Sequence, residues 1–226
     1  MSLIINIDTS IEKAHVSIAK DGVILKVLWN EFPKDHALFL QAAIKQLIVH
    51  TNINLKDISA IAVTAGPGSY TGLRVGMASA KGLCYALKKP LITLGTLEVL
   101  TSSAIHQLFV NDIIETALFC PMIDARRMEV FTGIYDKFLT PVLPECAMIL
   151  EETSFDTYLN KNKLFFIGSG AEKWKSICKH KNASFYTIAI IPEAMSNLSH
   201  NHFLLNKFTE LAYSEPRYLK EFQAKV

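Results

Sequence analysis

The spacing of hydrophobic residues predicts a chain that alternates between strands and helices. Three short strands are expected first, and Asp21-Gly22 between the second and the third is a favoured two-residue hairpin turn. Helical spacing then alternates with short apolar runs. The predicted order is βββαβα, with strands at 3–8, 15–20, 23–29 and 59–64 and helices at about 33–50 and 71–87.

The same order of elements returns later in the chain. A strand at 90–94 and a helix at 97–108 separate the two occurrences. The second pattern has strands at 117–123, 129–135, 146–150 and 164–167, with helices near 155 and at 172–180. We therefore expect two lobes, at residues 1–108 and 109–226, and a helix at about 193–212 that packs back onto the first lobe.

Turn residues support this repeat. In each half one strand ends in Ile-Asp, at Ile7-Asp8 and Ile123-Asp124, and a later strand ends in a glycine pair, at Gly66-Pro67-Gly68 and Gly168-Ser169-Gly170. A mixed sheet flanked by helices and present twice is the plan of the actin, Hsp70 and hexokinase superfamily. By this analogy we expect an α/β fold of two actin-like ATPase (ribonuclease H-like) lobes.

Charge and cysteine content narrow the possible functions. Basic and acidic residues are interleaved, and a formal net charge of +2 makes no continuous positive surface for nucleic acid. The four cysteines are far apart, which favours reduced core thiols over a zinc site or disulfides. No apolar run reaches membrane-spanning length and no signal peptide is apparent, so we expect a cytoplasmic protein without a membrane partner.

One motif resembles that of a known family. Residues 61–76 read IAVTAGPGSYTGLRVG and closely resemble the signature of the TsaB (YeaZ) family; residues 121–130 and 216–219 are also similar to that family. The glycines permit a tight strand-to-helix turn, which is suited to holding an anion or a partner, although a purely structural turn is the alternative. The residues of this signature loop are Gly66, Pro67, Gly68, Thr71 and Gly72.

The resemblance implies a component of the bacterial pathway that forms N6-threonylcarbamoyladenosine (t6A) in tRNA. The related transferase of that pathway, TsaD, carries a His-x-x-x-His metal-binding helix just after a Lys-Pro-Leu-Ile strand. Here Lys89-Pro90-Leu91-Ile92 is followed by a helix in which Thr96 and Leu100 take the histidine positions. Two imidazole ligands are thereby lost, and leucine has no ligand atom. We therefore predict no metal site and no catalytic residue.

Nucleotide binding is expected to be weak at most, with no cofactor required. Phosphate-binding turns of this superfamily usually carry a glycine after the aspartate, and both turns here lack it. The remaining histidines, His15 among them, are expected at the surface or hydrogen-bonded. Residual ATP or ADP binding would involve Asp8, Thr9, Ser10, Asp124, Arg126, Gly168 and Gly170.

Two enzymes are the alternative functions. An actin-like kinase or ATPase would need intact phosphate turns, and an M22-type metallopeptidase would need the histidine pair. The chain shows neither feature. It also lacks a Gly-x-Ser-x-Gly elbow for a serine nucleophile. We therefore favour a protein that acts through its surfaces.

The first two helices have more apolar surface than one sheet contact uses. Leu40, Ala43, Ile44 and Leu47 form a face that packs on the sheet. Small residues at Gly72, Gly76 and Ala80 would allow another helix to approach closely, although the two helices could also bury these faces against each other. The predicted partner interface consists of Leu38, Ala42, Lys45, Val49, Arg74, Met77, Lys81 and Tyr85.

The resemblance also implies the partners. Proteins similar to this family pair with the TsaD-like transferase through the helical region of the first lobe, and form homodimers by the same surface when alone. A TsaE-like ATPase joins, and tRNA is reached through the complex. The implied function is to stabilise and position the transferase that modifies adenosine 37 of ANN-decoding tRNAs.

Overall fold

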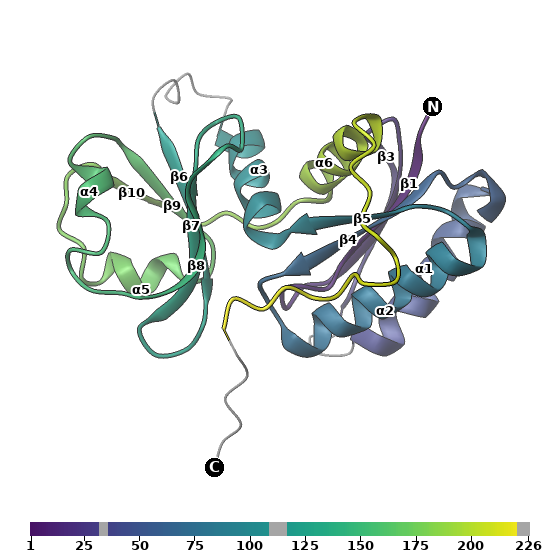
Figure 1. The fold of residues 1–226 in the computed structure, drawn as a ribbon, viewed down its shortest axis with the longest axis horizontal. Helices are drawn as coiled ribbons and strands as arrows, with labels where there is room; N and C mark the ends of the chain where they lie inside the picture. Colours follow the sequence, from purple (N-terminus) through teal and green to yellow (C-terminus); the bar gives the residue numbers. More distant parts are fainter. Residues whose placement is uncertain (32–35, 109–116, 221–226) are drawn as a thin grey trace, which may run out of the picture. The chain divides into compact units, whose positions relative to one another are not determined.

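The computed structural model describes residues 1–31, 36–108 and 117–220, which form two compact units (Figure 1). Unit 1 consists of Met1–Thr96 and Ile191–Arg217, and unit 2 of Leu97–Ile190 with the residues from Tyr218. The division differs from the predicted one at residue 108. Helix α3 (Thr96–Leu108) lies in unit 2 from Leu97 on, whereas α6 (Pro192–Leu204) belongs to unit 1.

Unit 1 is built on a five-stranded mixed sheet. The strands are β1 (Leu3–Asp8), β2 (His15–Lys20), β3 (Val23–Trp29), β4 (Ala60–Gly66) and β5 (Leu91–Gly95), in the order β3-β2-β1-β4-β5. The first three pair antiparallel, and β4 and β5 add parallel to β1. Its helices besides α6 are α1 (His36–Thr51), α2 (Tyr70–Leu87) and the 3-10 turn η1 (Leu55–Asp57).

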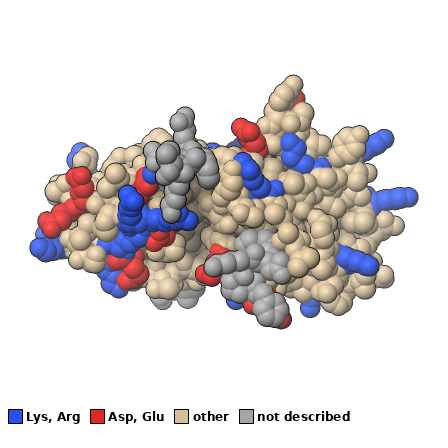
Figure 2. Space-filling model, turned by 90° about the horizontal axis from the view of Figure 1, so that it is seen from below, with Lys and Arg blue, Asp and Glu red and all other residues tan. Residues whose placement is uncertain are grey.

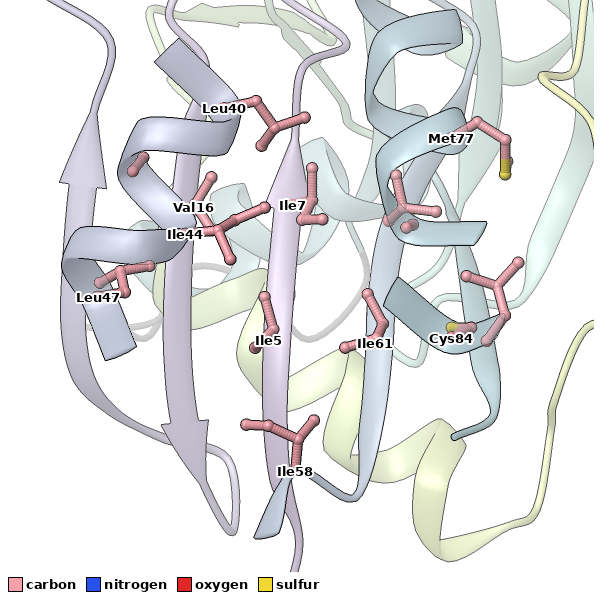
Figure 3. Close-up of a cluster of buried hydrophobic side chains, with 14 of the residues drawn as sticks. Ile5, Ile7, Val16, Leu40, Ile44, Leu47, Ile58, Ile61, Met77 and Cys84 are labelled. Atoms are coloured by element: carbon pink, nitrogen blue, oxygen red, sulfur yellow. The ribbon is translucent and has the colours of Figure 1, made fainter. Parts of the chain in front are cut away.

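The main core of unit 1 lies between this sheet and the helices α1 and α2 (Figure 3). Side chains alternate along β1, so that Ile5 and Ile7 point into this core while Asn6 faces α6 and donates to the Ser196 hydroxyl. Both faces of the central strands are covered, which explains their nearly continuous burial. The predicted sheet-facing side of α1 is confirmed, since Leu40, Ala43, Ile44 and Leu47 are buried.

Unit 2 repeats the plan of unit 1. Its strands are β6 (Leu118–Asp124), β7 (Glu129–Tyr135), β8 (Pro141–Ile149), β9 (Leu164–Ile167) and β10 (Ala183–Tyr186), in the order β10-β9-β6-β7-β8. Two short helices, α4 (Asp156–Leu159) and α5 (Ala171–Lys175), complete it with α3. The pairing is again antiparallel for the first three strands and parallel for the last two. The predicted fold of two actin-like lobes is therefore confirmed.

Four elements differ from the prediction for physical reasons. Strand β10 was not predicted; it forms because it pairs with β9 and because Phe185 stacks on Phe166. Strand β8 begins at Pro141 rather than 146, and α5 ends at Lys175, where the Ser176 hydroxyl bonds back to a helix carbonyl. The predicted helix at 193–212 ends at Leu204, and its predicted remainder consists of turns and an isolated bridge from Thr209 to Leu91. The predicted start of α1 at 33–35 lies outside the described residues.

Candidate functional site

The signature loop between β4 and α2 packs closely on the turn that follows β1. A Cβ atom added to Gly68 would collide with the Ser10 carbonyl oxygen, and one added to Gly72 with the Thr9 carbonyl oxygen. The Ser69 backbone N–H donates to Ser10 O (2.7 Å). Ser69 also caps α2 by accepting from Gly72 N (3.2 Å). Two amides of the loop, those of Ser69 and Gly72, are thus used inside the protein, which supports the structural interpretation of the loop.

The C-terminal segment covers the other side of the same loop. Arg217 N donates to Ala65 O (2.6 Å), and the Arg217 guanidinium donates to Gly66 O (3.3 Å). Gly66 has φ +118°, and a Cβ there would strike the Arg217 carbonyl oxygen. Gly68 is instead required for space, because its φ lies outside the left-handed region. Arg217 of the motif at 216–219 therefore contacts the signature loop.

The first turn, at residues 8–10, points into unit 1. Asp8, Thr9 and Ser10 are buried. Oδ1 of Asp8 accepts hydrogen bonds from Ser10 N (2.9 Å), Ser10 Oγ (2.6 Å) and Thr64 Oγ1 (2.8 Å), and Thr9 Oγ1 donates to Gly72 O (2.7 Å). Oδ1 of Asp8 is therefore occupied by the protein itself, whereas the buried Oδ2 has no hydrogen-bond partner among the described residues. A contribution of this turn to nucleotide binding stays a prediction.

Sequence reasoning missed the environment of His15. Register pairs His15 with Asp8 across β1 and β2, and places its Nδ1 3.9 Å from Asp8 Oδ2. The ring is fully buried against Trp29, and neither ring nitrogen has a hydrogen bond among the described residues. Burial lowers the pKa of His15, with Asp8 and Glu193 partly opposing the shift. The expectation of a surface or hydrogen-bonded histidine is wrong at this position.

This buried imidazole makes stability depend on pH. Because the pKa of His15 is lowered on folding, the unfolded chain binds its proton more readily. We expect full stability above pH 6.5 and a loss as pH falls below that value, by at most about 1.4 kcal/mol per pH unit. Denaturant unfolding between about pH 5.5 and 7 measures this slope. His15→Phe should flatten it and the exposed control His50→Gln should not; equal slopes in all three proteins would contradict the assignment.

The second turn, at residues 124–126, carries exposed polar groups. Asp124 Oδ1 accepts from Arg126 N (2.7 Å) and pairs with Lys173 Nζ (2.9 Å). Partial burial would raise the pKa of Asp124, but the bonds from Lys173 and Arg126 outweigh it and leave the pKa lowered. Gly168 and Gly170 pack closely on Met122, so the glycine pair supports β6. Of the predicted nucleotide residues, Asp124 and Arg126 thus face solvent.

The positions that would carry metal ligands lie in the interior. Thr96 and Leu100 are buried at the start of α3. Within residues 1–31, 36–108 and 117–220, no three His, Cys, Asp or Glu side chains gather as a metal ion would require. Burial raises the pKa of Cys84 to about 11 and that of Cys120 to about 12, so both remain uncharged thiols near neutral pH.

In the described part of the chain, no helix is long and apolar enough to cross a membrane.

The predicted interface residues fall into three groups. Leu38, Val49 and Tyr85 are 75%, 68% and 82% exposed, and Ala42 and Lys45 are also exposed. Arg74 is exposed and stacks on the Tyr70 ring at 4.0 Å. Two predictions need correction: Met77 lies in the core at 2% exposure, and Lys81 Nζ donates to Ala212 O (3.2 Å) and Ser214 O (2.9 Å) of its own chain.

A different set of small residues faces outward on α2. Gly72, Gly76 and Ala80 are buried, and Gly76 packs on Thr9 and Val63, so they serve the contact with the chain's own sheet. Exposed residues recur instead every four positions, at Ala78, Gly82 and Ala86. We call this stripe, together with Leu38, Ala42, Val49 and Tyr85, the outer face of α1 and α2. Figure 2 shows mostly uncharged side chains on the part of unit 1 seen from below, with separate Lys and Arg side chains scattered among them.

A hollow of about 410 Å³ borders the outer face. Among the described residues it is lined by Leu28, Trp29, Leu38, Phe39, Ala42 and Gln46, with Asn30, Glu31 and Ala43. Strand β3 and helix α1 contribute its walls. A protein that binds the outer face could therefore insert a side chain into the hollow beside it.

Comparison with known proteins gives a consistent result. The family model described as TsaD, tRNA N6-adenosine threonylcarbamoyltransferase, matches residues 27–226. The tRNA threonylcarbamoyladenosine biosynthesis protein TsaB of Bacillus subtilis is 30% identical over 66% of this chain and 63% of its own length. The TsaB of Escherichia coli is 23% identical over 96% and 94%.

Solved structures agree on the fold. A Pseudomonas aeruginosa protein described as similar to the peptidase YeaZ superimposes with a TM-score of 0.84 at 23% identity, covering 97% of this chain and 100% of that one. The aligned part of the Bacillus subtilis relative is less than two thirds of its length. The match to the Escherichia coli relative extends over nearly all of both chains.

Proposed function

Because the chain belongs to the TsaD family and, within it, to the TsaB (YeaZ) group, we propose that it serves t6A biosynthesis as a partner of a TsaD-type threonylcarbamoyltransferase. In this role it stabilises and positions the transferase, which modifies adenosine 37 of ANN-decoding tRNAs. The chain itself performs no chemical step. It acts in the cytoplasm, where the tRNA substrate of the transferase is found.

The outer face of α1 and α2 is the observation that carries this proposal. Leu38, Val49 and Tyr85 together expose large apolar side chains, while Ala78 and Gly82 leave room for a second helix to approach. Exposed apolar surface of this kind on a folded domain is typical of a site for another protein. Small residues bordered by larger apolar ones suit helix-to-helix packing.

The interior of the chain supports a non-catalytic role. Asp8 Oδ1 accepts three hydrogen bonds within unit 1, Thr96 and Leu100 stand at the predicted ligand positions, and the Ser69 and Gly72 amides are bonded to their own chain. A nucleotide or metal bound to this chain is not needed for the proposed role. Weak binding of ATP or ADP at Asp124 and Arg126 would not change it.

Further partners follow from the same proposal. A TsaE-like ATPase joins the complex, and tRNA binds to the complex as a whole. Without its partner the chain pairs with a second copy through the outer face, because the same apolar surface then remains uncovered. The homodimer and the complex with the transferase are therefore alternatives that compete for one surface.

Co-purification tests this proposal. The chain and the TsaD-type protein of the same organism are expressed together, with an affinity tag on one of them, and analysed by size-exclusion chromatography with light scattering. We expect a complex in which both chains are present in stoichiometric amounts. Recovery of the tagged chain without the other, under conditions in which both are folded, would contradict the proposed function.

A further inference from the structure

The tip of the β6–β7 hairpin presents two arginines in a backbone conformation that side chains disfavour. Arg126 has φ 72° and Arg127 has φ 47°, both in the left-handed region. Asparagine and glycine normally occupy such positions in tight hairpins. Because residues in this conformation persist where the surrounding structure holds them, an outlier pair is a reason to look for a function.

The tip is held firmly by hydrogen bonds. Arg126 N donates to Asp124 Oδ1 (2.7 Å), and Glu129 N donates back to Arg126 O (3.0 Å). Leu150 N, just after β8, donates to Met128 O (2.7 Å). The backbone that carries the two arginines is therefore fixed before any ligand arrives, which lowers the entropy cost of binding.

The carboxylates around the tip already have lysine partners. Lys173 pairs with Asp124 (2.9 Å), Lys220 with Glu129 (2.7 Å) and Lys175 with Glu172 (3.3 Å). Arg126 and Arg127 are exposed. Within the described residues neither forms an ion pair, and this includes pairs with Glu151 and Glu152, which follow β8. The two guanidinium groups are thus available to an external anion.

We propose that Arg126 and Arg127 bind phosphate groups of an RNA backbone. A guanidinium donates two parallel hydrogen bonds to a phosphate, and adjacent arginines suit successive phosphates. Interfaces with nucleic acid are polar and positively charged, whereas the centres of protein interfaces are depleted of charge. That the RNA is tRNA rests on the proposed function; the phosphate chemistry of the site does not.

RNA binding by the full chain alone tests this site. The probe is an unmodified transcript of an ANN-decoding tRNA, and its affinity is measured by fluorescence anisotropy from about 50 to 200 mM salt. The variant Arg126→Asn/Arg127→Gly removes both charges and accepts the left-handed backbone, so its thermal stability should equal or exceed that of wild type. We expect at least about a tenfold loss of affinity at the lowest salt, and a salt slope smaller by about 1.5, from 0.7 to 0.9 per phosphate.

The matched control removes the same charge from unit 1. Lys56 and Lys88 are exposed, and Lys88 is also left-handed, with φ 54°. Lys56→Asn/Lys88→Asn should change the affinity by less than about twofold if the hairpin is the site rather than net charge in general. An equal loss in both variants would overturn the proposal.

Three other results would also overturn it. Two are no measurable binding by the wild type at the lowest salt and an unchanged affinity in the hairpin variant. The third is a hairpin variant that still binds RNA but no longer captures the TsaD-type protein in an RNA-free pull-down. The last result would assign the arginines to an acidic protein surface. Because the RNA assay contains no partner protein, it is independent of the co-purification experiment. A chain that binds RNA through the hairpin but fails to co-purify would contradict the proposed function and leave the arginine site standing.

Discussion

Ala42→Glu is expected to abolish pairing with the TsaD-type protein while leaving the fold of unit 1 intact. Ala42 lies on the outer face, beside Leu38 and the hollow between β3 and α1. A carboxylate placed there would lose its water on association without gaining a partner, which costs roughly 3–5 kcal/mol. Association should therefore weaken by more than about a hundredfold.

The fold should tolerate this change because Ala42 is exposed in the single chain. The sheet-facing residues of α1 are untouched, and glutamate is a good helix former. Val23→Glu is the matched control, since Val23 on β3 is 68% exposed and outside the outer face. Pull-down, light scattering and a melting curve are compared for the wild type and both variants. If Ala42→Glu pairs normally, the outer face is not the interface; if it unfolds the chain, Ala42 supports the core.

Gly72→Ala should strongly destabilise unit 1, whereas Gly82→Ala, in the same helix, should stabilise it. A Cβ on Gly72 would overlap the Thr9 carbonyl oxygen, which is backbone and cannot move aside, so we expect a loss of roughly 3 kcal/mol. A Cβ on Gly82 meets no atom within 4 Å, and alanine is the better helix former by about 1 kcal/mol.

Chemical denaturation of the purified variants measures both effects. The opposite signs separate a steric requirement of the signature loop from a general effect on α2. Equal stability of Gly72→Ala and wild type, combined with loss of partner binding, would show that the loop is a contact site and that its glycines serve the partner. We expect instead that Gly72→Ala loses binding in proportion to the fraction of unfolded chain.

Local patterns were sufficient to predict most of the fold. Continuous apolar runs and the Asp21-Gly22 turn fixed β1, β2 and β3 to the residue, because buried strands and two-residue hairpins have distinctive sequences. The duplication was recognised from element order and turn residues. Strand β10 was missed because Phe185 depends on contacts with Phe166 and Trp174 that are distant in sequence.

The candidate sites were harder to predict because they depend on contacts between distant segments. The glycines of the signature loop were recognised, but their partner, the carbonyls of Thr9 and Ser10, follows from strand register and helix placement. Burial of Met77 likewise depends on which side of α2 faces the sheet, and burial of His15 depends on what covers its side of β2. A small rotation of a helical assignment changes such a residue from interface to core.

The most direct test of the central claim is t6A formation in a reconstituted reaction containing the TsaD-type protein, the TsaE-like ATPase, the threonylcarbamoyl donor and an unmodified ANN-decoding tRNA, with and without this chain. We expect that t6A forms when the chain is present, falls to background when it is omitted, and is lost again with Ala42→Glu but not with Val23→Glu. The chain without the TsaD-type protein should produce none. Robust t6A formation by this chain without that transferase would contradict this function. An undiminished reaction when this chain is omitted would contradict it as well.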